Sequence, residues 1–279
     1  MMTSLPASLT ARWVGRVRVG ARITAINLRG QADFRTDFIA SILDGALWQT
    51  SVIVFASVLL VRFPGIGDWS SPSVLLLASM RMTSHGLVTL FFGRILYISS
   101  IVQEGQIDGY LTRPMSVYRQ IQYARFSANA FGDLLVALSL LIAAIAWFDQ
   151  PWTPVRVLLL VGGIVGGAFL EAAITNVFAG LTLIRPYAAS WSFRFQDILA
   201  AVGNYPLNIL PIGVQLALTY LVPIAFIAYL PAAAITGQTA TTAVPAVLAY
   251  AAPLVGVAGY ALSRWIWARC LDRYEGANM

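Results

Sequence analysis

The chain has 279 residues, of which 58% are hydrophobic and only 11% are charged, whereas a soluble globular domain has about 25% charged residues. A chain this apolar cannot cover its surface in water, so the composition excludes a soluble protein and predicts an all-α integral membrane protein. The net charge is +6, and the basic residues, all arginines, lie between apolar runs, which indicates anionic lipid headgroups and not nucleic acid as their partner. One histidine and the single Cys270 give no reason to expect a metal site or an intramolecular disulfide.

The first part of the chain, 1–37, is expected to form a cytoplasmic amphipathic segment. Within 8–35, Trp13, Val17 and Ile23 alternate with arginines at roughly helical spacing. This pattern is typical of a helix that lies in the plane of the membrane. A disordered basic arm is the alternative, although it would leave those apolar side chains in water.

Hydropathy predicts six transmembrane helices in one membrane domain over 38–268, because each span needs roughly 20 apolar residues. The predicted spans are 39–61, 73–100, 127–148, 155–184, 212–230 and 244–267. A short cytoplasmic tail, 269–279, follows the last span, and no internal repeat is visible.

Arginines in the loops orient these spans. Fourteen arginines fall on the side that holds the N-terminal segment, the second-to-third and fourth-to-fifth connectors and the tail, whereas only Arg62 and Arg156 fall on the other side. Because cytoplasmic loops carry an excess of basic residues, both termini are predicted to be cytoplasmic, which agrees with an even number of spans.

Four ionisable residues fall within predicted spans: Arg81, His85, Asp133 and Glu171. A charge there costs about 2.5–3.5 kcal/mol on insertion scales, so it normally faces a cavity or a partner. Arg81 and His85 share a helix face, and a rise of about 1.5 Å per residue puts His85 nearer to the depth of Glu171. These three residues are interpreted either as an intramembrane polar path or as a structural pairing. Asp133 is placed near the cytoplasmic interface.

The fourth span carries Gly162, Gly163, Gly166 and Gly167, which form two overlapping Gly-x-x-x-Gly pairs. Such pairs allow helix backbones to approach closely, here within one subunit or between subunits, although glycine is also simply common in membrane helices. The uncharged segment 231–245 is placed outside and is a candidate re-entrant segment, which requires burial by protein.

The connector over 101–126, between the second and third spans, has an unusual composition. It contains the string Gln103-Glu104-Gly105-Gln106-Ile107-Asp108-Gly109-Tyr110-Leu111-Thr112-Arg113-Pro114. The charges would give register and the apolar side chains would give burial if the segment docked on a soluble partner. An ordinary solvated loop is the alternative reading of the composition.

The connector string Glu-Gly-x-Ile-Asp-x-x-Leu-x-Arg-Pro resembles the cytoplasmic connector of the ABC-type-two exporter permeases, whose fold is called type V. The similarity spans nearly the whole chain in the right order. Further similar segments are Gly65–Ser70 (a Gly-Trp-Ser signature), Tyr205-Pro206, Val222–Phe226 and Tyr229–Ala232 (a proline-marked fifth span), and 267–277 (a Trp-x-x-x-Leu-x-x-Tyr-x-Gly-Ala tail). Arg81 departs from the family pattern, which leaves the substrate open.

This resemblance implies a permease subunit of an ABC exporter in the inner membrane of a bacterium, without catalytic residues of its own. It implies two kinds of partner, a second permease subunit (identical or not) and cytoplasmic ATPase subunits, and it makes the connector the ATPase-coupling helix. The coupling residues implied are Glu104, Gly105, Ile107, Asp108, Leu111, Arg113 and Pro114.

The sequence contains no lysine and therefore no Gly-x-x-x-x-Gly-Lys-Ser/Thr phosphate loop. No cofactor is expected in this chain, and ATP and Mg are expected on the partner ATPase. A secondary transporter is the main alternative, but it predicts matching pseudo-symmetric halves, which are not seen. A membrane-embedded enzyme acting on lipids would need a cluster of acids, His or Ser near an interface.

Overall fold

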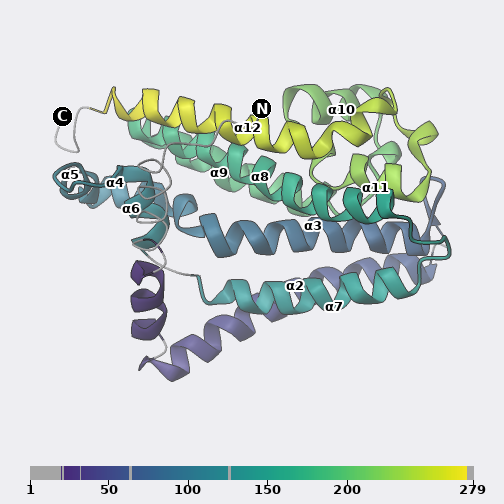
Figure 1. Ribbon diagram of the computed structural model, residues 1–279, viewed down its shortest axis with the longest axis horizontal. Coiled ribbons are helices and arrows are strands. Elements are labelled where there is room, and N and C mark those ends of the chain that lie inside the picture. The colour runs from purple at the N-terminus through teal and green to yellow at the C-terminus, as the bar shows by residue number, and fades with distance from the viewer. Residues whose placement is uncertain (1–19, 21, 32, 63–64, 125–126, 275–279) are drawn as a thin grey trace, which may run out of the picture.

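The structure is a computed structural model that describes residues 20, 22–31, 33–62, 65–124 and 127–274, and it forms an elongated helical bundle (Figure 1). The α-helices are α2 (Arg35–Arg62), α3 (Ser71–Phe92), α4 (Ile98–Gln103), α5 (Gln106–Leu111), α6 (Val117–Ala124), α7 (Asn129–Ala146), α8 (Pro154–Ile184), α9 (Ala189–Val202), α10 (Ile212–Leu216), α11 (Tyr229–Thr236) and α12 (Val247–Leu271). The two strands are β1 (Gly65–Ile66) and β2 (Trp69–Ser70), and the 3₁₀ helix η1 is Gly93–Tyr97.

Among the described residues, four helical segments are long and apolar enough to cross a membrane by length and composition: Ser71–Gln103, Asn129–Ala146, Pro154–Ile184 and Val247–Leu271. They coincide with the predicted second, third, fourth and sixth spans. The predicted first span lies inside α2, which has 28 residues and a length of about 42 Å at 1.5 Å per residue. The helical membrane class predicted from composition is therefore confirmed.

The predicted fifth span, 212–230, is not one helix. It contains α10, a π-helical turn over Ala217–Leu221, a break at Val222-Pro223 and the 3₁₀ turn Ile224–Phe226. The chain instead returns along the bundle through α9 and the segment 203–211, which lies in what we predicted to be a connector. Hydropathy missed α9 because Arg194, Gln196 and Asp197 interrupt its apolar residues.

The segment after α9 enters the bundle and leaves it again. Asn208 donates a hydrogen bond to the Gly67 carbonyl in the β-hairpin turn, whereas the Ile227 carbonyl packs against Gly167, well along α8. The chain then returns through α11 to Gln238, which donates to the Asp68 carbonyl. A re-entrant segment is tolerated in a membrane only where protein covers its irregular backbone. The residues of α11 are mostly buried, as this requires.

Glycines on α8 allow neighbouring backbones to approach closely. A Cβ on Gly166 would lie 2.6 Å from the Pro253 Cα of α12, and one on Gly163 would lie 2.8 Å from Pro231 of α11. Gly256 of α12 packs in turn against the Gly166 carbonyl. The Gly-x-x-x-Gly pairs therefore make close helix contacts within the subunit, which is one of the two alternatives that the sequence left open.

The two ends of the bundle differ, as Figure 1 shows: α4, α5 and α6 lie at the end where the C-terminus lies, which we call the connector end. The other end carries the β1–β2 hairpin, and we call it the hairpin end. The hairpin turn places both Gly67 (φ 56°) and Asp68 (φ 65°) at positive φ, as two-residue turns of this kind require. Trp69 is buried there and stacks on Tyr229, with ring centroids 5.5 Å apart.

The amphipathic N-terminal segment lies partly outside the described residues, since 1–19 are not among them. Residues 22–31 are helical, and this helix runs across the long direction of the bundle at the connector end (Figure 1). Asn27 fastens it to α6 by donating to the Tyr123 carbonyl at 2.6 Å. The crosswise direction is the one expected of an interfacial helix.

Candidate functional site

The connector between α3 and α7 folds into three short helices that form a compact unit. A left-handed glycine, Gly105 (φ 67°), turns the chain from α4 into α5. Gln120 of α6 then closes the unit, because its side-chain amide donates to the carbonyls of Tyr110 and Met115 at 2.8 and 2.5 Å. Over 101–124 the connector is therefore largely helical and not an irregular loop.

The predicted coupling residues divide into an anchor and an exposed surface. Ile107 is 0% exposed and belongs to an apolar cluster with the ends of α8 and α12, so it packs α5 against the bundle. Leu111 is 52% exposed although it is apolar. The others are exposed or half-exposed at the surface of the unit: Glu104, Gly105, Asp108, Arg113 and Pro114.

The tail motif and the connector motif contact each other. Trp267 of α12 packs edge-on against Tyr118 of α6, with ring centroids 5.4 Å apart. Tyr274, later in the tail motif, lies beside Asp108 of the connector motif. Burial is the largest cause that raises the pKa of the Tyr274 phenol, and the Asp108 carboxylate raises it further. The two strings that carry the family resemblance at distant places in the sequence therefore meet at the connector end.

Tyr118 joins the connector to two long helices. Its hydroxyl donates to Asn176 Oδ1 of α8 at 3.0 Å and lies 3.3 Å from the Tyr260 hydroxyl of α12. Asn176 continues the chain by donating from Nδ2 to Ser263 Oγ at 3.3 Å. Burial raises the pKa of the Tyr118 phenol well above its usual value, so it remains a donor. The Arg264 guanidinium covers the face of the Tyr118 ring.

The intramembrane polar residues also cluster, and the contact is made by His85, which the depth estimate placed nearer to Glu171 than Arg81. His85 Nδ1 of α3 lies 2.6 Å from Glu171 Oε1 of α8. Glu171 is 0% exposed, and Thr175 one turn farther donates to its backbone carbonyl. Arg81 is buried on the same face of α3. Asp133, which we placed near the cytoplasmic interface, lies in the first half of α7 and is 4% exposed.

A cavity of about 370 Å³ opens beside this cluster, between α2, α3, α7 and α9. Arg81, His85 and Asp133 line the cavity. Glu171 does not line it, but its carboxylate contacts the His85 side chain. The Asp44 and Asp197 side chains also line the cavity, and neither was identified from the sequence. Asp44 offered a signal, since it is an acid inside the predicted first span. Asp197 lies on α9, the helix that hydropathy missed.

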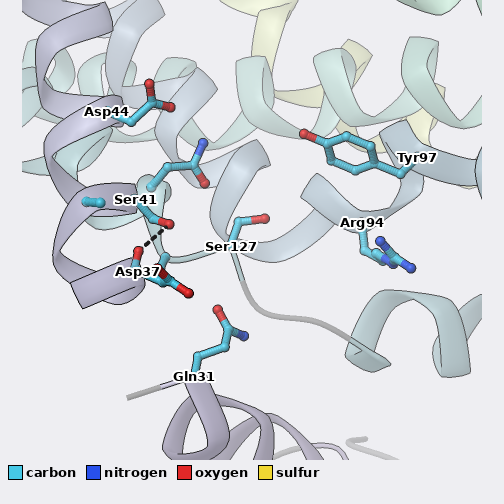
Figure 2. Close-up of a pocket in the computed structure, with 10 residues that line it drawn as sticks. Gln31, Asp37, Ser41, Asp44, Arg94, Tyr97 and Ser127 are labelled. Carbon is cyan, nitrogen blue, oxygen red and sulfur yellow. Dashed lines mark hydrogen bonds between the residues drawn. The ribbon is translucent and has the colours of Figure 1, made fainter. Parts of the chain in front are cut away.

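A second, larger cavity of about 730 Å³ lies next to the first one, toward the connector end, and we call it the vestibule. Figure 2 shows Asp37, Ser41 and Asp44 of α2 on one side of it, with Arg94 and Tyr97 facing them from the other side. The two cavities share four lining residues: Asp44, Tyr97, Ser127 and Asn129. The vestibule therefore leads into the intramembrane cavity.

Comparison with known proteins agrees with this architecture. A family model described as ABC-2 family transporter protein matches residues 46–278, which is most of the chain. No curated protein and no solved structure matches the chain.

Proposed function

The chain belongs to the ABC-2 family of transporter proteins, and we propose that it is the permease subunit of an exporter and docks a separate ATPase subunit. It is a multi-pass membrane protein and the transport component of an ABC system. In our proposal the connector end faces the cytoplasm of a bacterial cell, and two permease subunits together enclose the path.

The observation that carries the docking proposal is the exposed surface of α5. Asp108 and Leu111 of α5 are exposed, as is Glu104 at the end of α4 just before it, and the buried Ile107 fixes α5. An exposed leucine between charged groups on an ordered helix is what a protein-docking surface offers, since apolar burial gives affinity and charge gives register. Glu104 is itself oriented, because Gln106 donates to its carboxylate at 2.5 Å.

Coupling in this proposal passes through Tyr118. Movement of the docked α5 would move α6, which Gln120 holds to it through the Tyr110 and Met115 carbonyls. Tyr118 would transmit that movement to α8 through Asn176 and to α12 through Trp267. Switching between two arrangements of packed helices is a common basis for alternating access, and ATP binding on the partner would bias it.

Arginine substitutions on the exposed surface of α5 and the adjoining Glu104 test the docking. We expect Glu104→Arg combined with Leu111→Arg to leave membrane insertion and folding intact, because both side chains are exposed, and to abolish co-purification of the ATPase from detergent-solubilised native membranes. The matched control is Asp149→Arg, an exposed acid at the hairpin end. Undiminished co-purification of the ATPase with the double variant would refute a docking role for α5.

A further inference from the structure

The cavity beside His85 carries more negative than positive charge. Three carboxylates line it: Asp44 from α2, Asp133 from α7 and Asp197 from α9. Among the residues that the structure describes, none of the three forms an ion pair within 4 Å. Carboxylates in a membrane helix are costly unless they face water or a partner, so this grouping needs a counter-charge from somewhere.

The two cations in the cavity wall balance only part of this negative charge. His85 is held by Glu171 at 2.6 Å, so that pair balances itself. Arg81 reaches the C-terminal end of α9, where its Nε is 3.5 Å from the position of a Cβ on Gly203. The C-terminal end of a helix carries partial negative charge, which stabilises a guanidinium there. Arg81 also interacts electrostatically with Asp133, so within the described part of the chain one guanidinium faces three carboxylates.

Two neutral amides in the cavity wall each have a side-chain oxygen without a hydrogen-bond partner. Asn204 is 2% exposed, and its Nδ2 donates to the Ala200 carbonyl while Oδ1 has no partner. Gln196 Nε2 donates to Thr175 Oγ1, which itself donates to the Glu171 carbonyl, and Gln196 Oε1 is left unpaired. These partners fix the orientation of each amide, because only the nitrogen can donate.

Aromatic rings complete the surroundings. Trp48 and Tyr97 line the cavity and are both more than half exposed, so their faces are available. Aromatic faces attract organic cations, most strongly where water is excluded. The volume of about 370 Å³ lies within the range of small-molecule sites, roughly 300–1,000 Å³. The vestibule, with Asp37 in its wall, provides a polar route to the site from the connector end.

We propose that this cavity binds a small organic cation with an ammonium group, and that such compounds are the class of substrate that the transporter exports. The proposal rests on the transport function proposed above. Asp133 would receive the ammonium charge at the inner end, because it is nine-tenths buried and without a hydrogen bond to another described residue. Asp44 and Asp197 would attract the ligand from the rim, and the Asn204 oxygen would accept an N–H where one is present.

The test is direct binding to the purified permease in nanodiscs, with empty nanodiscs subtracted. The probe is dansylcholine, a fluorescent quaternary ammonium, and dansylglycine is the anionic compound with the same fluorophore. We expect saturable binding of dansylcholine, displacement by spermidine, and no saturable binding of dansylglycine. Tighter binding of dansylglycine would mean that Arg81 dominates the cavity, and it would overturn the proposal.

Two substitutions locate the site. We expect Asp133→Asn to raise the Kd for dansylcholine about tenfold or more, and the matched control Asp149→Asn at the hairpin end to leave it unchanged. Because Asp133 is buried, its variant is compared with Asp197→Asn on the exposed rim, which we expect to fold normally and to weaken binding several-fold. Wild-type affinity in both cavity variants would sink the proposal.

This experiment is independent of coupling, because no ATPase is present in it. A complex that hydrolyses ATP while its permease fails to bind dansylcholine would leave the exporter assignment standing and contradict only the substrate class. Conversely, cation binding by a permease that recruits no ATPase would contradict the exporter assignment alone.

Discussion

The Arg264 guanidinium lies over the ring of Tyr118, with its central carbon 3.2 Å from the ring centroid. Arg264 belongs to α12, whereas Tyr118 belongs to the connector, so this contact joins the docking surface to a membrane-spanning helix. The same tyrosine contacts α8 through Asn176. One side chain thus connects the connector to both long helices.

Tyr118→Phe should therefore separate ATP hydrolysis from movement of the spans. Phenylalanine keeps the ring under Arg264 but removes the hydroxyl, which leaves Asn176 Oδ1 buried without its donor, at a cost of about 1–3 kcal/mol. We expect the complex to assemble and hydrolyse ATP, with a loss of the ATP-dependent change in labelling of a cysteine placed at Ala200 in the cavity wall. Tyr187→Phe, an exposed tyrosine at the connector end, is the control. A normal labelling response in Tyr118→Phe would exclude this coupling route.

The His85–Glu171 pair should stabilise the packing of α3 against α8. Glu171→Gln keeps the shape of the side chain and removes its charge. Removing one member of a buried ion pair lowers the free energy of unfolding by at most about 3–5 kcal/mol. We expect a lower unfolding temperature in detergent for Glu171→Gln and for His85→Gln, and a double variant that loses less than the sum of the two. Additive losses in this double-mutant cycle would show that the two side chains do not interact.

Close backbone contact at Gly166 should not tolerate a methyl group. A Cβ there would lie 2.6 Å from the Pro253 Cα, and a backbone atom cannot move aside as a flexible side chain can. We expect Gly166→Ala to lower the free energy of unfolding by about 1–3 kcal/mol through overpacking. Gly213→Ala on α10 is the control, since nothing lies within 4 Å of its Cβ position. Equal thermal stability of the two variants would contradict the packing described here.

The sequence predicted those features that depend on local composition or on fixed helix geometry. Four of the spans follow from apolar length, and the pairing of His85 with Glu171 follows from counting the helical rise to a common depth. The connector surface around Glu104 was recognisable from its charges between apolar helices.

Features that depend on tertiary packing were not predictable in this way. Hydropathy placed α9 in a loop because Arg194 and Asp197 have the polarity of interfacial residues. The structure shows instead that Asp197 lines a cavity. Ile107 looked like a contact residue for the partner, whereas the ends of α8 and α12 bury it. Tyr118 carries no signal in its local sequence, since its role arises only where three distant segments meet.

The orientation of the bundle makes a separate prediction. The excess of arginines at the connector end predicts that this end is cytoplasmic. We expect a cysteine at Gln238 to react with a membrane-impermeant maleimide in intact cells, and one at Arg273 to react only after lysis. The native Cys270 is buried and gives the background signal. Labelling of the Arg273 cysteine from outside would reverse the assigned topology.

ATP hydrolysis by this chain with and without its native partners tests the central claim most directly. The chain contains no lysine and hence no phosphate loop, so the permease produced in a foreign host should hydrolyse no ATP above background. The complex purified from native membranes through a tag on this chain should hydrolyse ATP and contain a separate subunit with a phosphate loop. Hydrolysis at transporter-like rates by the chain alone, or a native complex that lacks an ATP-binding subunit, would contradict the account.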